Sequence, residues 1–279
     1  MPPTTPPMTY RYLRFTEPQA ELETWTHFAG AAEWYPKVLD AALRLPCFLR
    51  LPNDPIGFGS WAAAMVMSAA HTCHAALLLW SRANYLETTI LVRHLFEVLV
   101  QIAYFGARRD AFLPYHRRAM ARAGGAVAEG QPVKEVKFKE MFDSVMPGFY
   151  KTHYGAILSG SAHGGLAATI FRVDYASPDT PGVRLGSTYD ERWATFGNTY
   201  LQYILRALLQ ASINLDPRAI DACDPESRQV VTEALSWLDK VFEADWTEFP
   251  SKRPLILACS DLTGWKPPPP GPPDSSSAR

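Results

Sequence analysis

Polar side chains within the otherwise apolar stretch 85–105 are the first candidates for chemistry. A helical step of about 100° per residue places Arg93, Glu97, Gln101 and Tyr104 on one stripe, with His94 and Glu87 at its margin, and leaves the remaining faces of the helix apolar. Arg93 and Glu97 are four residues apart, so they can form an ion pair within the helix. Such a pair is either a satisfied structural contact or part of a binding or catalytic site, and both interpretations stay open.

A second candidate is the small-residue segment 153–165, which contains Ser159 and His163. If this segment is helical, the two residues are neighbours on one face, and a hydroxyl beside an imidazole can act as a nucleophile and its base. Alternatively, His163 satisfies carbonyl groups at the end of a helix, because Gly164 and Gly165 follow it. Arg93, Glu97, Ser159 and His163 are therefore the candidate catalytic residues.

Basic residues cluster after residue 107, although the whole chain carries a net charge of only −1. A local basic patch of this kind can contact RNA phosphates, and the alternative is an ordinary solvated helix face. The candidate substrate-binding residues are Tyr154, Arg109, His116, Arg117 and Arg118.

Metal and nucleotide sites are not expected. His71 and His74, like His94 and Glu97, are spaced by one helical turn, but the further glutamates of a di-iron site are missing. The four cysteines form no CxxC pair, and no glycine-rich phosphate loop or dinucleotide fingerprint is present. We therefore expect no metal and no cofactor, and we interpret these histidines as core residues with satisfied hydrogen bonds.

Two spaced motifs resemble those of a known group of proteins. Arg93-x3-Glu97 lies within a long apolar helix, and Tyr154-x3-Leu158-Ser159-x3-His163 follows about sixty residues later. Together they resemble an uncharacterised bacterial all-helical domain family, over about residues 60–165. The resemblance implies an all-helical fold and two shared motifs, without a reaction.

A looser resemblance is to the HEPN superfamily, whose members are helical bundles that often act as dimeric, metal-independent ribonucleases in toxin and phage-defence systems. Their signature is R-x4-6-H, frequently followed by glycine. The spacing and the trailing His163-Gly164 are similar, but Leu158 stands where the arginine belongs. Arg109-x6-His116 is a second match, with Pro114 between the two residues. The resemblance implies action on RNA, in which a cation and a proton-transfer group serve phosphodiester cleavage.

The pattern of apolar residues predicts an all-α, multi-helix bundle with a small irregular or β-hairpin insertion. A helix starts at Thr16, and Pro36 is expected to kink or restart it. The other expected helices are 61–80, 85–105, 110–127 with a bend near Pro114, 134–145, 149–163, 190–213 and 225–244.

Three regions are expected along the chain. Residues 1–15 form a disordered arm, 16–250 the helical domain with a possible β-hairpin at 167–187, and 251–279 an extended, proline-rich disordered tail. The N-terminus lacks the basic start and apolar run of a secretory signal. The apolar helix 61–80 contains Ser68, His71, Thr72 and His74, so we interpret it as a buried helix of a cytoplasmic protein without membrane contact.

Three classes of function remain from the sequence. The first is a HEPN-like effector acting on RNA, with a degenerate motif and a possible homodimer. The second is a non-catalytic helical binding or regulatory protein. The third is a small-molecule enzyme that uses the buried Arg/Glu/His stripe. Convergence of the candidate residues on an accessible groove favours catalysis, whereas a closed and mutually paired cluster favours a binding protein.

Overall fold

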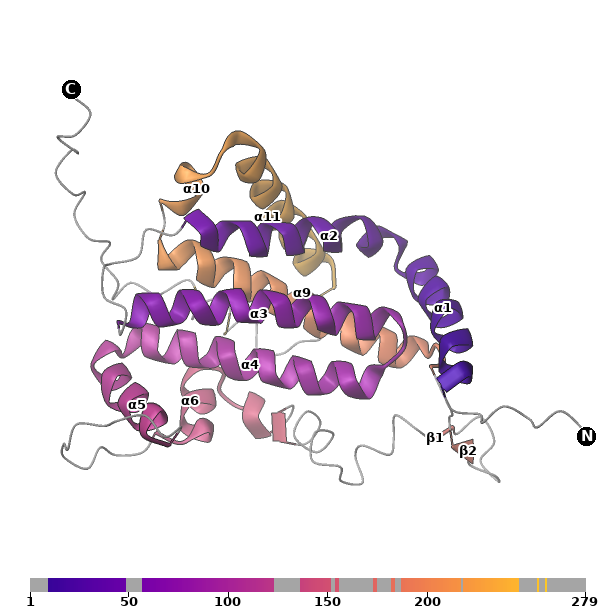
Figure 1. Cartoon of the computed structure of the whole chain (residues 1–279), viewed down its shortest axis with the longest axis horizontal. Helices are drawn as coiled ribbons and strands as arrows, with labels where there is room; N and C mark the ends of the chain where they lie inside the picture. Colours follow the sequence, from indigo (N-terminus) through magenta and orange to yellow (C-terminus); the bar gives the residue numbers. More distant parts are fainter. Residues whose placement is uncertain are drawn as a thin grey trace, which may run out of the picture.

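Helices dominate the computed structural model, which confirms the predicted all-α bundle (Figure 1). It describes residues 10–48, 57–122, 136–151, 154–155, 173–174, 182–183, 187–216, 218–245, 255 and 259. The helices are α1 (Tyr10–His27), α2 (Ala29–Arg44), the 3-10 helix η1 (Leu45–Phe48), α3 (Phe58–Ser81), α4 (Tyr85–Ala107), α5 (Arg109–Arg122), α6 (Phe138–Val145), α9 (Glu191–Leu215), α10 (Ala219–Ala222) and α11 (Pro225–Asp245).

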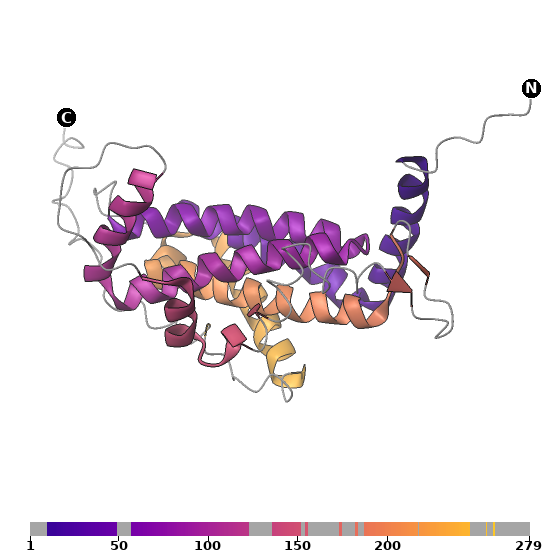
Figure 2. The ribbon, with the colours of Figure 1, turned by 90° about the horizontal axis from the view of Figure 1, so that it is seen from below.

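The bundle is built around an antiparallel pair, α3 and α4, which lie side by side along the long axis of the molecule (Figure 1). Helix α9 packs against both of them from one side, and α2 adjoins α3 and α11 (Figures 1 and 2). The opposite side of the α3–α4 layer is covered by none of the helices drawn in Figure 2, and α5 and α1 lie at its two ends.

Trp80, near the end of α3, joins three helices. Its indole is fully buried and its Nε1 donates a hydrogen bond of 2.7 Å to the carbonyl of Ala194 on α9. Gly197 makes this close approach possible, because a Cβ atom there would lie 2.6 Å from Trp80 Cδ1. The rings of Trp25 on α1, of Phe28 and of Tyr35 on α2 also contact Trp80. One large aromatic residue thus fixes how α1, α2 and α9 meet α3.

The break between α1 and α2 falls at Phe28, and the helix does not restart at Pro36. Phe28 leaves the helical conformation (φ −106°, ψ 42°), whereas Pro36 lies inside α2. The packing of the Phe28 ring on Trp80 accounts for the position of the break. Similarly, Pro114 lies within the continuous helix α5.

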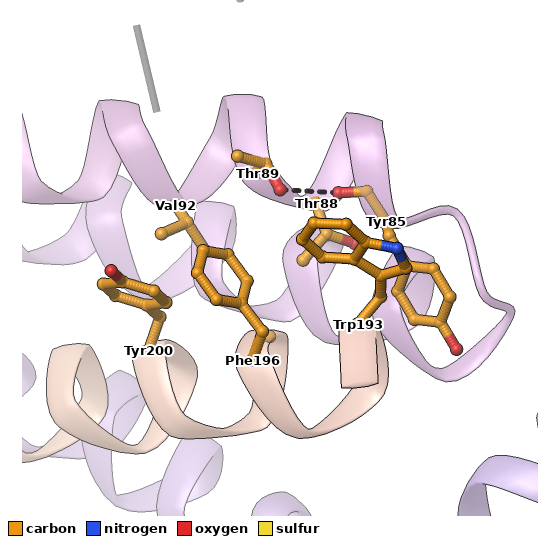
Figure 3. A pocket seen from close by; sticks show the side chains of 8 residues that line it. Tyr85, Thr88, Thr89, Val92, Trp193, Phe196 and Tyr200 are labelled. Atoms are coloured by element: carbon orange, nitrogen blue, oxygen red, sulfur yellow. Dashed lines mark hydrogen bonds between the residues drawn. The ribbon is translucent and has the colours of Figure 1, made fainter. Parts of the chain in front are cut away.

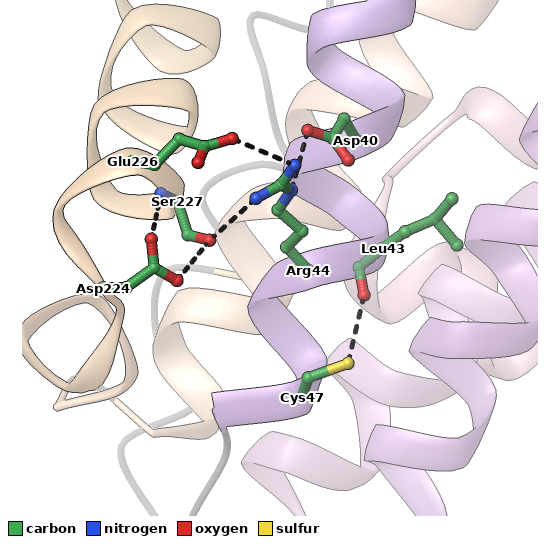
Figure 4. Close-up of polar contacts among 7 residues, drawn as sticks. All are labelled: Asp40, Leu43, Arg44, Cys47, Asp224, Glu226 and Ser227. Carbon is green, nitrogen blue, oxygen red and sulfur yellow. Dashed lines mark hydrogen bonds and ion pairs between the residues drawn. The ribbon is translucent and has the colours of Figure 1, made fainter.

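Helix α11 is attached to α2 by a polar cluster (Figure 4). Arg44 forms ion pairs of 2.8 Å with Asp40 and 3.5 Å with Glu226, and it donates to the Ser227 hydroxyl. Asp224 accepts from the backbone N–H of Ser227, which satisfies a free donor in the first turn of α11 and lowers the pKa of Asp224. The cluster holds the first turn of α11 against the last turn of α2.

The ends of the helical domain differ from the predicted boundaries. Helix α1 begins at Tyr10, so the predicted arm 1–15 is too long. Leu255 and Cys259 are fully buried, and the Leu255 N–H donates to the hydroxyl of Tyr203 on α9. These two residues, which lie beyond the predicted boundary at residue 251, are therefore packed against the described helices, and Leu255 also bonds to α9.

A short β pairing lies within the segment for which the hairpin was predicted. Strands β1 (Val173–Asp174) and β2 (Gly182–Val183) are antiparallel, with Val173 opposite Val183. Of the predicted range 167–187, the structure describes only these strands and Ser187.

Candidate functional site

Arg93, Glu97 and Tyr154, three of the predicted site residues, meet on the outer side of α4. Arg93 Nε donates to Glu97 Oε1 at 2.9 Å and to the Tyr154 hydroxyl at 3.1 Å. The Tyr154 hydroxyl itself donates to Glu97 Oε1. Each of the three groups therefore bonds to both others, and we call them the Arg93 cluster. The side chains of Arg93 and Glu97 are only 20% and 22% exposed.

Tyr154 reaches this cluster from a segment of π-helical conformation that follows α6. Tyr150, Lys151, Tyr154 and Gly155 have this wider helical turn. The Tyr154 ring packs on Phe142 of α6 at 4.6 Å and stacks on Tyr150 at 5.1 Å, between ring centroids. A Cβ atom on Gly155 would lie 3.0 Å from the Tyr150 carbonyl, which accounts for a glycine there. Aromatic packing thus aims the Tyr154 hydroxyl at Glu97.

The electrostatics of the cluster keep Tyr154 protonated. Burial, together with the hydrogen bond to Glu97, raises the pKa of Tyr154 to about 12. The phenol is consequently a donor at neutral pH and no phenolate nucleophile forms. Glu97 Oε1 already accepts hydrogen bonds from Arg93 and Tyr154. The two charged groups that the sequence suggested as catalytic candidates, Arg93 and Glu97, are therefore paired with each other.

The polar stripe of α4 continues through Gln101, which also has partners. Its amide nitrogen donates to the Glu97 carbonyl at 3.1 Å, and its amide oxygen accepts from the Tyr115 hydroxyl at 3.1 Å. Tyr115 lies on α5. The stripe is therefore bound from two directions, by Tyr154 and by α5.

The predicted substrate-binding residues of α5 have contacts with residues other than those of the Arg93 cluster. Arg109 lies over the ring of Phe58 at 3.7 Å, donates to the Gly106 carbonyl, and has its pKa lowered by burial to about 10. His116 stacks on Phe112, at 5.4 Å between ring centroids. Arg117 is exposed and Arg118 is partly exposed. The Arg109–His116 pair thus packs on aromatic rings, while Arg117 faces solvent.

Ser159 and His163, the predicted nucleophile and base, lie outside the residues that the structure describes. Their roles stay predictions. The same holds for Leu158, which occupies the arginine position of the HEPN-like motif.

An apolar hollow lies between the first halves of α4 and α9 (Figure 3). The space in it that can hold a water-sized sphere is only about 10 Å³, far below the ~300–1,000 Å³ of typical ligand pockets. Its walls include Val92, Phe196 and Tyr200, and its hydroxyls Thr88 and Thr89 donate to backbone carbonyls of their own helix. The hollow can therefore make apolar contacts with a ligand, but the hydroxyl protons of these two threonines are already used in hydrogen bonds to the backbone.

The outer surface of α3 was missed by the sequence analysis. Seven of its residues are exposed and follow one another at helical spacing on a single side: Ala64, Met67, Ser68, His71, His74, Ala75 and Leu78. We call these seven the α3 outer face. All 24 residues of α3 are uncharged types, apart from the titratable histidines. The prediction of a fully buried helix is thus wrong for this side, and His71 and His74 are not core residues.

The same composition makes α3 and α4 long and apolar enough to span a membrane, by length and composition alone. Burial separates the two helices, since 61% of the relevant window of α4 is buried inside the bundle but only 44% of that of α3. The sequence did contain a signal for the α3 outer face. Small and polar residues recur every three or four positions in this helix, which predicts that they share one side, and none of them is charged.

In the part of the chain that the structure describes, no three His, Cys, Asp or Glu side chains are grouped so that they could hold a metal ion. No protein-family profile, no curated protein and no solved structure matches the chain.

Proposed function

We propose that this protein is a helical binding protein whose α3 outer face receives a protein partner. The observation that carries the proposal is the uncharged, exposed side of α3. Met67 and Leu78 are about two-fifths exposed there, and the side chains of Ser68, His71 and His74 make no hydrogen bond with other described residues. An apolar surface with unused donors and acceptors is the composition that protein interfaces bury.

The state of the Arg93 cluster supports a binding protein over an enzyme. A catalytic carboxylate must reach a proton on the substrate, and a catalytic cation must reach developing charge. Glu97 and Arg93 instead bond to each other and to Tyr154. The cluster serves to fasten the Tyr154 segment to α4, which shapes the layer that carries the binding face.

Site-specific photo-cross-linking in the cell tests the proposal. A photoreactive amino acid in place of Met67 is expected to give a covalent adduct with a protein. The same amino acid in place of Gln229, an exposed residue on α11, is the matched control and is expected to give none. Equal adduct yields at the two positions, or none at Met67, would refute the binding face.

Action on RNA is a second candidate, favoured by the exposed cations Arg108 and Arg117 at α5. Neither side chain forms an ion pair with a described residue. If α5 contacts RNA phosphates, Arg117→Gln should weaken binding of single-stranded RNA and lower the salt dependence by about one counterion. The HEPN-like hypothesis adds that His163→Ala abolishes any toxicity of expression, and full toxicity of this variant would exclude His163 as the base.

A further inference from the structure

We propose that the partner on the α3 outer face is a second copy of this chain, bound with the two α3 helices antiparallel across a twofold axis at His71. This inference rests on the proposed binding function and names its partner. It is carried by the order of side chains along the face, by its lack of charge and by its size.

The order of side chains makes the face complementary to itself. In an antiparallel pair centred on His71, residues at equal distances on either side of it face each other. Leu78 then meets Ala64 of the second copy, and Met67 meets Ala75. Each large side chain is opposite a small one, which is the arrangement that fills space between two closely packed helices.

The polar members of the face take symmetric positions. His71 falls opposite its own copy near the axis, so the two imidazoles can hydrogen-bond to each other. Ser68 and His74 reach the same height along the contact, but they lie about 120° apart around the helix and therefore at its two opposite edges, where water can still reach them.

The charge of the chain permits this contact. The α3 outer face has no Asp, Glu, Lys or Arg, and the chain has a net charge of −1, so two copies approach without strong repulsion. A lipid surface suits the face less well. Ser68, His71 and His74 would be left without partners in hydrocarbon, whereas a helix pair in water lets the two copies of His71 meet and leaves Ser68 and His74 at hydrated edges.

The available area agrees with a stable dimer. Helix α3 has 24 residues and is therefore about 36 Å long, and with α4 beside it the layer is about 20 Å wide. In projection this strip covers about 700 Å², of which α3 contributes about half, against the roughly 800 Å² of accessible surface that each partner buries in a standard interface. On α4 the layer adds Ile90 and His94, which are also exposed.

Sedimentation equilibrium of the full chain at pH 8 tests the proposal. The protein is expected to be a dimer at micromolar concentration. Leu78→Lys should raise the dissociation constant by at least about 100-fold, because the symmetry places the buried ammonium in the contact twice. Leu113→Lys on α5 is the matched control, with the same residue type and the same exposure of 42%, and should leave the dimer intact.

A cysteine at the axis gives an independent readout. In a Cys47→Ser background, which removes the exposed thiol, His71→Cys should form a disulfide-linked dimer on mild oxidation. Leu113→Cys in the same background should not. Cys73, Cys223 and Cys259 are buried and should not interfere.

The outcomes separate this inference from the proposed function. A monomer at 100 μM, a dimer broken by Leu113→Lys but not by Leu78→Lys, or binding of the monomer to phospholipid vesicles through Leu78 would each overturn the homodimer. If the purified chain is monomeric while the Met67 cross-linker captures a different protein in the cell, the homodimer is wrong and the binding face stands. Failure of both experiments refutes the binding face itself.

Discussion

The outer sides of α3 and α4 belong to one layer of the bundle, yet their side chains are used in opposite ways. The α4 side carries Arg93 and Glu97, and both find partners inside the molecule. The α3 side carries no formal charge, and none of the helices drawn in Figure 2 lies over it. Arg93 and Glu97, whose types suggest chemistry, are thus paired inside the molecule, whereas Met67 and Leu78, whose types suggest a core, are exposed.

This difference follows from the cost of burial. A charged pair under the π-helical segment needs hydrogen bonds to offset lost hydration, and Tyr154 supplies them. An exposed Met or Leu costs little by itself, so no local contact is needed to cover the α3 outer face. The Arg93 cluster therefore satisfies its own hydrogen bonds within the chain. The α3 outer face, by contrast, leaves apolar side chains exposed, and this is the difference on which the proposed binding role rests.

The largest expected effect is on the α4 side. Glu97→Ala leaves Arg93 and Tyr154 without their common acceptor in a mostly buried site, and it should lower the free energy of unfolding by about 3 kcal/mol. Glu33→Ala is the control, because the Lys37–Glu33 pair on α2 has the same i,i+4 spacing but is well exposed, and it should cost less than about 0.5 kcal/mol. Urea unfolding of both variants measures the difference. Equal costs would mean that the Arg93 cluster is no more structural than a surface pair.

The next effect concerns the hydroxyl of Tyr154. Tyr154→Phe keeps the ring but removes the donor to Glu97, and should cost about 2 kcal/mol at pH 7. Tyr150→Phe, on the ring stacked against it, is the matched control and should cost less.

The pH dependence of this cost has a definite sign. The pKa of Tyr154 is raised from 10.0 to about 12, so the stabilisation is complete below pH 10 and is lost as the pH rises through 12. The difference in unfolding free energy between wild type and Tyr154→Phe should therefore shrink between pH 10 and 12. A constant or growing difference would contradict a protonated, donating Tyr154.

Much of the helical framework was predictable from apolar spacing. The predicted helices 85–105, 190–213 and 225–244 each agree with α4, α9 and α11 to within about two residues at either end, because long periodic stretches with clear starts leave little ambiguity. The break at Phe28 was not predictable in this way. It depends on the packing of Phe28 against Trp80, a contact between residues about fifty positions apart.

The site was predictable only in part, for a similar reason. The i,i+4 spacing marked Arg93 and Glu97, and the motif marked Tyr154, but neither reveals that the three groups bond to one another. The exposure of Met67 and His71 was missed because an uncharged helix has the same composition whether it is buried by its own chain or by a second one.

The smallest effect tests whether the α3 outer face is dispensable for folding. Met67→Ala, measured at concentrations where the chain is monomeric, should change the free energy of unfolding by less than about 0.5 kcal/mol, because the side chain is already 41% exposed. Met141→Ala on α6 is the matched control: its side chain is fully buried, and its loss should cost about 3 kcal/mol. A large cost at Met67 would mean that its own chain already covers this side chain, and the α3 outer face would then be part of the core and not a surface for a partner.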